Sequence, residues 1–220
     1  MVTIGLIVLN VLVFFYQASL QFGGESHTTR AAEAFVLEFG AVPCRLTGYC
    51  ASGDAFPHPF VGVLTSMFLH GGLLHVAGNM LYLWIFGDNV EDTLGHGRFL
   101  LFYLLSGVAA AATQVAASPE STVPMIGASG AVSGVLGAYL ILFPHATVLT
   151  LVMFFFFVRL VHIPAVIVLG LWIVVQLFNG LGAFHSVGGE GGVAWFAHIG
   201  GFMAGIALLF IMRPRSRVRL

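Results

Sequence analysis

The sequence has no lysine and very few charged side chains of any kind. Charged residues make up 8% of the 220 residues, against roughly 25% in an ordinary soluble domain. The net charge of −1 gives none of the basic excess that nucleic-acid binding needs, so we expect no nucleic-acid partner. Hydrophobic residues make up 59% and the mean hydropathy is +1.00, more apolar surface than a soluble fold of this length can bury. The sequence therefore predicts an integral membrane protein that has the lipid bilayer as its surroundings.

Six apolar segments are candidate membrane helices, because a helix needs about 20 apolar residues to cross a bilayer. They are residues 2–20, 60–86, 99–117, 129–143, 164–179 and 194–212. The first lacks the basic start of a secretory signal, so we interpret it as a membrane helix. The apolar run 147–158 is too short to span and is expected at the interface or partway into the membrane. We predict an all-α fold, a polytopic bundle of six transmembrane helices, as a single domain over residues 1–220.

The placement of arginine predicts the orientation, because cytoplasmic segments of membrane proteins are enriched in basic residues. The basic tail 213–220 follows the last span, so we expect the C-terminus in the cytoplasm, and with six spans the N-terminus as well. The same topology puts Arg98 and Arg159 inside, and it puts the long polar loop 21–58 outside. We expect the protein in a cell membrane, plasma or inner.

The only two cysteines, Cys44 and Cys50, lie in the loop 21–58. They are either two unpaired thiols or, if the loop faces an oxidising compartment, a small disulfide ring. The sequence leaves both alternatives open.

Polar side chains inside membrane spans are costly, and four of them need an account: Ser129, His198, His75 and Asn79. A helix from Ser129 to Phe143 is only about 21 Å long, against about 30 Å for a hydrocarbon core, so it should begin below the outer surface. A helix from His198 to Met212 has the same length. The hydroxyl and the imidazole are therefore expected at similar depth.

Small residues surround both positions. Gly127 and Gly130 flank Ser129 and allow tight turning, and Gly201 lies three residues after His198. The patterns Gly130-xxx-Gly134 and Gly201-xxx-Gly205 let two membrane helices approach closely. Close helices at matched depth make a hydrogen bond between Ser129 and His198 geometrically possible.

These residue types suit acyl transfer. A serine hydroxyl needs a nearby base, and a neutral histidine can serve. The backbone N–H of Ser129 at a helix start could stabilise an oxyanion, and His75 and Asn79, which share a helix face at i and i+4, could complete the hole. No Asp or Glu falls inside a proposed span, which favours a Ser–His dyad over a triad and argues against a carboxylate metal site.

Each residue also has a structural interpretation. The Gly-Ala-Ser-Gly segment could serve helix packing, His198 could be a satisfied core histidine, and His75 with Asn79 could bond across helices. Five further histidines fall near span ends and are interpreted as interfacial: His58, His70, His96, His145 and His162. The matched depths favour one common site over four separate structural roles.

Three segments resemble the rhomboid family of intramembrane serine proteases. They are MFLHGGLLHVAGNMLYLWIFGDNVEDTLG (67–95), GASGAVSGVLGAYLILFP (127–144) and AHIGGFMAG (197–205). They occur in the family's order, and the combination is specific although each piece is weak alone. The resemblance implies a rhomboid-like fold.

The resemblance also implies roles for the residues. Ser129 would be the nucleophile and His198 the general base, with His75 and Asn79 stabilising the oxyanion. The implied substrates are single-span membrane proteins, cleaved near helix-destabilising sites without a metal or cofactor. One departure is Ser133, which stands where some members have an aromatic residue stacked on the catalytic histidine, so another group must orient His198 here.

Two other functions compete with an active protease. The chain could be a catalytically inactive rhomboid-like protein that binds client helices, or a channel or transporter for a small polar solute. The presence of both Ser129 and His198 favours the serine endopeptidase, because a protein without chemistry needs neither.

Overall fold

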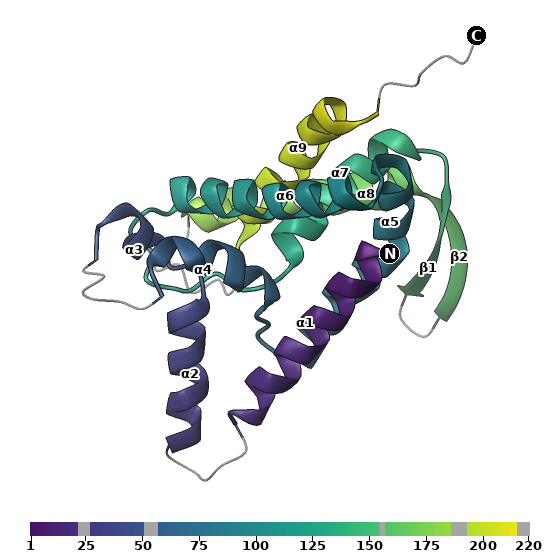
Figure 1. The fold of residues 1–220 in the computed structure, drawn as a ribbon. Helices are drawn as coiled ribbons and strands as arrows, with labels where there is room; N and C mark the ends of the chain where they lie inside the picture. The colour runs from purple at the N-terminus through teal and green to yellow at the C-terminus, as the bar shows by residue number, and fades with distance from the viewer. Residues whose placement is uncertain (22–26, 51–56, 155–156, 186–192, 215–220) are drawn as a thin grey trace.

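The computed structural model describes residues 1–21, 27–50, 57–154, 157–185 and 193–214, and Figure 1 shows its course. The elements are α1 (Val2–Ser19), α2 (His27–Phe39), α3 (Pro43–Thr47), α4 (Pro59–Thr65), the 3-10 helix η1 (Ser66–Phe68), α5 (Leu73–Leu94), α6 (His96–Ala117), α7 (Ser129–Leu142), β1 (Thr147–Phe154), β2 (Phe157–Pro164), α8 (Ala165–His185) and α9 (Trp195–Met212). Of the tail that was predicted to be cytoplasmic, residues 215–220 lie outside the described residues.

The predicted polytopic helix bundle is confirmed. Within the described residues, four helices are long and apolar enough to cross a membrane, namely α1, α6, α8 and α9. The bent pair of α4–η1 with α5 counts as a fifth if it is one span, and α7 is a shorter apolar helix. A helix therefore lies at each of the six predicted positions.

The predicted span 60–86 is wrong in its bounds. The chain breaks between η1 and α5 with a bend of 79°, and α5 runs on to Leu94. Gly71 and Gly72 lie at the break, where glycine makes a continuous helix unfavourable. The side chain of Gln17 on α1 holds the broken segment, because it donates to the carbonyl of His70 and accepts from the N–H of the same residue.

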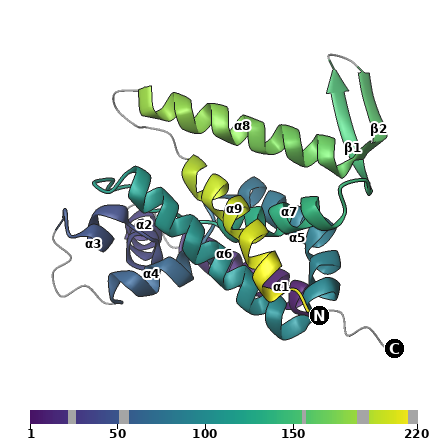
Figure 2. The ribbon, with the colours of Figure 1, turned by 90° about the horizontal axis from the view of Figure 1, so that it is seen from above.

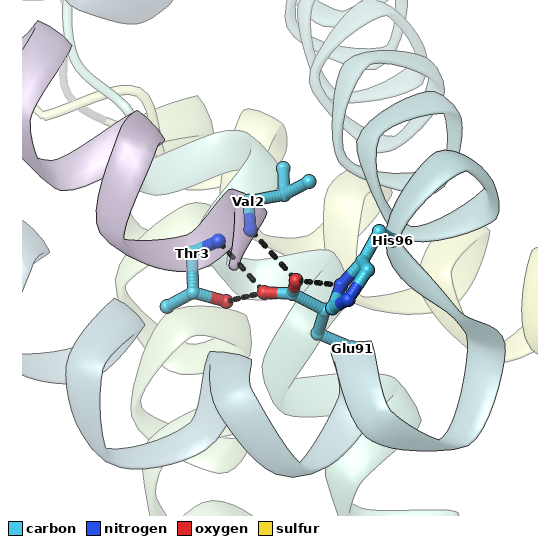
Figure 3. A network of polar contacts seen from close by, with 4 residues as sticks. All are labelled: Val2, Thr3, Glu91 and His96. Atoms are coloured by element: carbon cyan, nitrogen blue, oxygen red, sulfur yellow. Dashed lines mark hydrogen bonds and ion pairs between the residues drawn. The ribbon is translucent and has the colours of Figure 1, made fainter.

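The longer α5 brings a carboxylate inside a helix that was expected to have none. Glu91 is fully buried, and Figure 3 shows it at the start of α1. Its carboxylate accepts from the backbone N–H of Val2 and of Thr3, each at 2.7 Å, and from the Thr3 hydroxyl at 2.6 Å. His96 also contacts it. Negative charge is favourable at a helix N-terminus, so Glu91 ties the start of α1 to the end of α5.

The all-α prediction misses one hairpin. Residues 147–164, expected at the membrane interface, form strands β1 and β2, which pair antiparallel with Thr147 opposite Pro164 and Val152 opposite Arg159. β-Branched and apolar residues favour a strand here over a short helix. In Figure 2 the hairpin lies crosswise at the beginning of α8 and points away from the bundle.

The first long loop is partly helical and contains the one pair of cysteines. Cys44 in α3 and Cys50 form a disulfide, which decides between the two alternatives left open by the sequence. Within the described part of this loop, the short bridge between Ala41 and Met125 joins it to the segment before α7.

The core of the bundle is the contact among α6, α7 and α9. Every residue of α7 from Gly130 to Tyr139 is buried. A Cβ atom on Gly201 would overlap the carbonyl oxygen of Gly130, and one on Gly205 would overlap the carbonyl oxygen of Gly134. Helices α7 and α9 are therefore in direct backbone contact, which glycines spaced four residues apart allow.

Candidate active site

Ser129 is the first residue of α7, at the end of a sharp turn. Gly127 takes φ +125, a left-handed conformation that favours glycine, and its N–H donates to the carbonyl of Ser66 at 2.8 Å. Ser129 is half-buried, and its backbone N–H belongs to the first turn of the helix, where amide groups have no intrahelical partner. The turn thus presents a hydroxyl and free amides together.

His198 lies in the first turn of α9, which a side chain from α6 caps. The amide oxygen of Gln114 accepts from the N–H groups of Phe196 and Ala197 at 3.1 and 3.2 Å. Because Gly201 allows α9 to lie against Gly130, the imidazole reaches the serine. Nε2 of His198 lies 2.9 Å from Oγ of Ser129, a hydrogen-bond distance.

His75 and Asn79 from α5 face the same place. His75 Nδ1 accepts from the N–H of Gly71 at 3.2 Å, so the ring carries its proton on Nε2. That atom is next to Gly127, since a Cβ there would lie 2.8 Å from it. The amide nitrogen of Asn79 donates to the carbonyl of His75 at 2.9 Å, which leaves its second N–H available.

A pocket of about 240 Å³ joins these groups. Its lining includes His75, Asn79, Ser129 and His198, together with Trp172 of α8. The four sequence-predicted polar residues are thus brought together by three separate helices, α5, α7 and α9. The arrangement can hold a carbonyl group between a nucleophile and several hydrogen-bond donors.

Two residues of α8 belong to the site and were not predicted from the sequence. Gln176 is 5% exposed, and its amide oxygen lies 2.7 Å from Nδ1 of His198. The ring of Trp172 lies against the imidazole with centroids 5.9 Å apart. These two contacts act on the orientation of the His198 ring, which the sequence had left open. The side chain of Ser133 does not take part, because its hydroxyl donates to the carbonyl of Ser129 at 2.6 Å.

The interpretation of His70 as interfacial is wrong. Its side chain is 1% exposed, because it lies in the break before α5 and packs edge-on against His75 with centroids 5.1 Å apart. Its Nε2 lies 3.5 Å from the N–H of Ala128. The sequence position near a span end was misleading, since the chain turns inward there. His58, His96, His145 and His162 are exposed.

Comparison with known proteins identifies the class to which this fold and site belong. The model of the rhomboid domain matches residues 57–215, which is most of the chain and contains every residue of the pocket. The chain belongs to the rhomboid family.

Individual relatives are similar over different lengths. The rhomboid protease GluP of Bacillus subtilis is 37% identical over 134 residues, which cover 61% of this chain and 23% of the relative. Rhomboid protein 1 of yeast mitochondria (Saccharomyces cerevisiae) is 31% identical over 66% of this chain and 40% of its own length. The rhomboid protease AarA of Providencia stuartii is 29% identical over 97% of this chain and 74% of its own length. The chain thus spans less than half the length of the first two.

Proposed function

We propose that the protein is an intramembrane serine endopeptidase that uses Ser129 and His198 to cleave membrane-embedded segments of single-span membrane proteins. The observation that carries the proposal is the 2.9 Å contact between Oγ of Ser129 and Nε2 of His198, inside a pocket that Asn79 and His75 also line. Membership of a family whose relatives are named as proteases supports it further.

The chemistry follows from the positions of the groups. Nε2 of His198 takes the hydroxyl proton while Oγ of Ser129 attacks the scissile carbonyl carbon, and an acyl-enzyme forms after the amine leaves with that proton. The oxyanion is stabilised by the N–H of Ser129 at the start of α7 and by donors from His75 and Asn79. Nε2 of His198 then takes a proton from a water molecule as that water attacks the ester carbonyl, and the proton passes to Oγ of Ser129 as the carboxylic acid is released. The reaction needs no metal or cofactor.

Topology fits this proposal. The arginine distribution favours cytoplasmic N- and C-termini, with the pocket below the opposite surface. Broken backbone in a bilayer is tolerated where it lines a cavity, and the bend before α5 and the turn before α7 both adjoin the pocket. Substrates with helix-destabilising residues fit such a site, because only an unwound strand exposes its carbonyl groups to Ser129.

The test is cleavage of a single-span reporter by purified protein in liposomes. The wild type should cleave it, whereas Ser129→Ala and His198→Ala should not. Ser106→Ala is the matched control, because this buried serine of α6 lies outside the pocket, and it should retain activity. Cleavage by folded Ser129→Ala, or none by folded wild type with several reporters, would contradict the proposal. If the folded wild type does not cleave, binding of the reporter would indicate an inactive protein that binds client helices. Flux of a small solute through the liposome membrane would instead indicate a channel or transporter.

A further inference from the structure

Gln176 of α8 contacts Nδ1 of His198, the ring nitrogen that does not contact Ser129. Its amide oxygen lies 2.7 Å from Nδ1, while Nε2 of the same ring is 2.9 Å from Oγ of Ser129. The two contacts lie on opposite sides of one imidazole. Ser129, His198 and Gln176 therefore form a continuous chain of hydrogen bonds across α7, α9 and α8.

A third contact fixes which end of the Gln176 amide faces the ring. The amide nitrogen donates to the backbone carbonyl of Trp172 at 3.3 Å, and a carbonyl can only accept. The NH₂ group is therefore directed to the backbone of α8, which leaves the oxygen for His198. An amide oxygen can only accept, so Nδ1 of His198 must carry the proton.

This assignment decides what the other ring nitrogen can do. A neutral imidazole has one protonated nitrogen, so with the proton on Nδ1 the lone pair lies on Nε2, facing the Ser129 hydroxyl. That is the form a general base needs. The opposite tautomer would present an N–H to Ser129 and could not take its proton.

The surroundings hold the ring in the same orientation. Trp172 lies one turn before Gln176 on the same face of α8, and its ring packs on the imidazole and on Phe202. Trp195 packs edge-on at 6.2 Å between centroids. Because Gln176 is neutral, the hydrogen bond orients the ring without placing a charge in the membrane, where charges are costly.

We propose that Gln176 is a positioning residue of the catalytic unit, with its amide oxygen selecting the His198 tautomer that can act as a base. The inference rests on the proposed function and extends the Ser129–His198 dyad to an arrangement of Ser129, His198 and Gln176. A glutamine that only joined α8 to α9 would affect stability but not the position of the ring proton, and this difference makes the two roles separable.

The experiment compares Gln176→Leu and Gln176→Glu with the wild type. Leucine removes the acceptor, so kcat should fall by up to about 10⁴-fold, the loss that follows when a catalytic histidine is held in the wrong tautomer, with KM nearly unchanged. Glutamate keeps an accepting oxygen and should recover much of the loss. Its negative charge should also move the acidic limb of the kcat/KM profile to higher pH, because a neighbouring carboxylate favours the imidazolium.

Nitrogen-15 NMR of histidine reports the tautomer of the ring, a quantity that does not depend on the stability of the fold. The His198 signal, assigned by its loss in His198→Ala, should report the Nδ1–H tautomer in the wild type and a shift toward the Nε2–H tautomer in Gln176→Leu. Gln114→Leu is the matched control, because Gln114 also bonds the first turn of α9 but accepts from the backbone N–H groups of Phe196 and Ala197. It should leave the tautomer unchanged.

The outcomes separate this inference from the proposed function. An inactive folded wild type overturns the proteolytic proposal, and an active wild type with normal kcat and tautomer in Gln176→Leu overturns only the role of Gln176. If Gln176→Leu does not fold, Gln176→Glu decides: activity with a displaced pH limb supports the role, and folded protein with an undisplaced limb contradicts it.

Discussion

Helix α7, which carries the proposed nucleophile, differs sharply in burial from α8, the helix that carries Gln176. α7 is buried without interruption from Gly130 to Tyr139 and meets α9 backbone to backbone at Gly134 and Gly205. Along the described side chains of α8, by contrast, buried positions are few, namely Ala165, Leu169, Gln176 and Gly180. Much of α8 presents apolar side chains to the surroundings, as Leu171 at 64% and Phe178 at 73% exposed illustrate.

This contrast separates two requirements of the site: the distance between Ser129 and His198, and the orientation of the imidazole ring. The Ser129–His198 distance is set by interlocked backbones, which tolerate almost no displacement because packed interiors resist changes of even one methylene. The orientation of the imidazole depends instead on two side chains of α8, Trp172 and Gln176, which one helix face holds in place. Changes in the first region should therefore remove the fold, and changes in the second should remove mainly activity.

The largest expected effect comes from adding a methyl group at the α7–α9 contact. Gly205→Ala places a Cβ against the carbonyl of Gly134, and because both partners are backbone, the helices must separate. Overpacking of this kind typically costs about 1–3 kcal/mol and occasionally more, so thermal unfolding in detergent, followed by circular dichroism, should show a clear loss of stability.

The matched substitution in the second region is Gly170→Ala on α8. A Cβ at Gly170 meets nothing within 4 Å, and alanine is the better helix former by about 1 kcal/mol, so stability should be unchanged or slightly higher. Equal unfolding midpoints for the two variants would remove the distinction between the regions.

A smaller effect, confined to rate, is expected from Asn79→Ala. The variant removes one proposed oxyanion donor, which typically lowers kcat by about 10²–10³-fold. Asn89→Ala is the control, because Asn89 makes the same type of bond to the carbonyl four residues earlier on α5 but is exposed. If steady-state cleavage is slowed equally in both variants, Asn79 has no special part in the reaction.

The sequence predicts the helical bundle well, because long apolar segments such as 99–117 leave few alternatives to a membrane helix. It predicts less well where local signals conflict. The second span was expected to end at residue 86, whereas α5 continues to Leu94, and Glu91 is buried there because the start of α1 supplies its hydrogen-bond donors. The run 147–158 is apolar without a clear period, which leaves strand and helix ambiguous.

The candidate site shows the same division. Ser129, His198, His75 and Asn79 were chosen as polar residues inside spans, and the structure places all of them at one pocket. Gln176 is also a polar residue within a predicted span, 164–179, but it was not predicted to belong to the site. No spacing rule connects it to His198, since the contact depends on how α8 lies against α9, which only the folded chain determines.

The most direct test of the central claim is the site of covalent attachment of a fluorophosphonate to the folded protein, located by peptide mass spectrometry. A serine activated by a neighbouring base should react, so we predict a single adduct on Ser129 of the wild type and almost none on His198→Ala. An adduct on another residue, equal labelling of His198→Ala, or unlabelled wild type in its folded state would contradict the account.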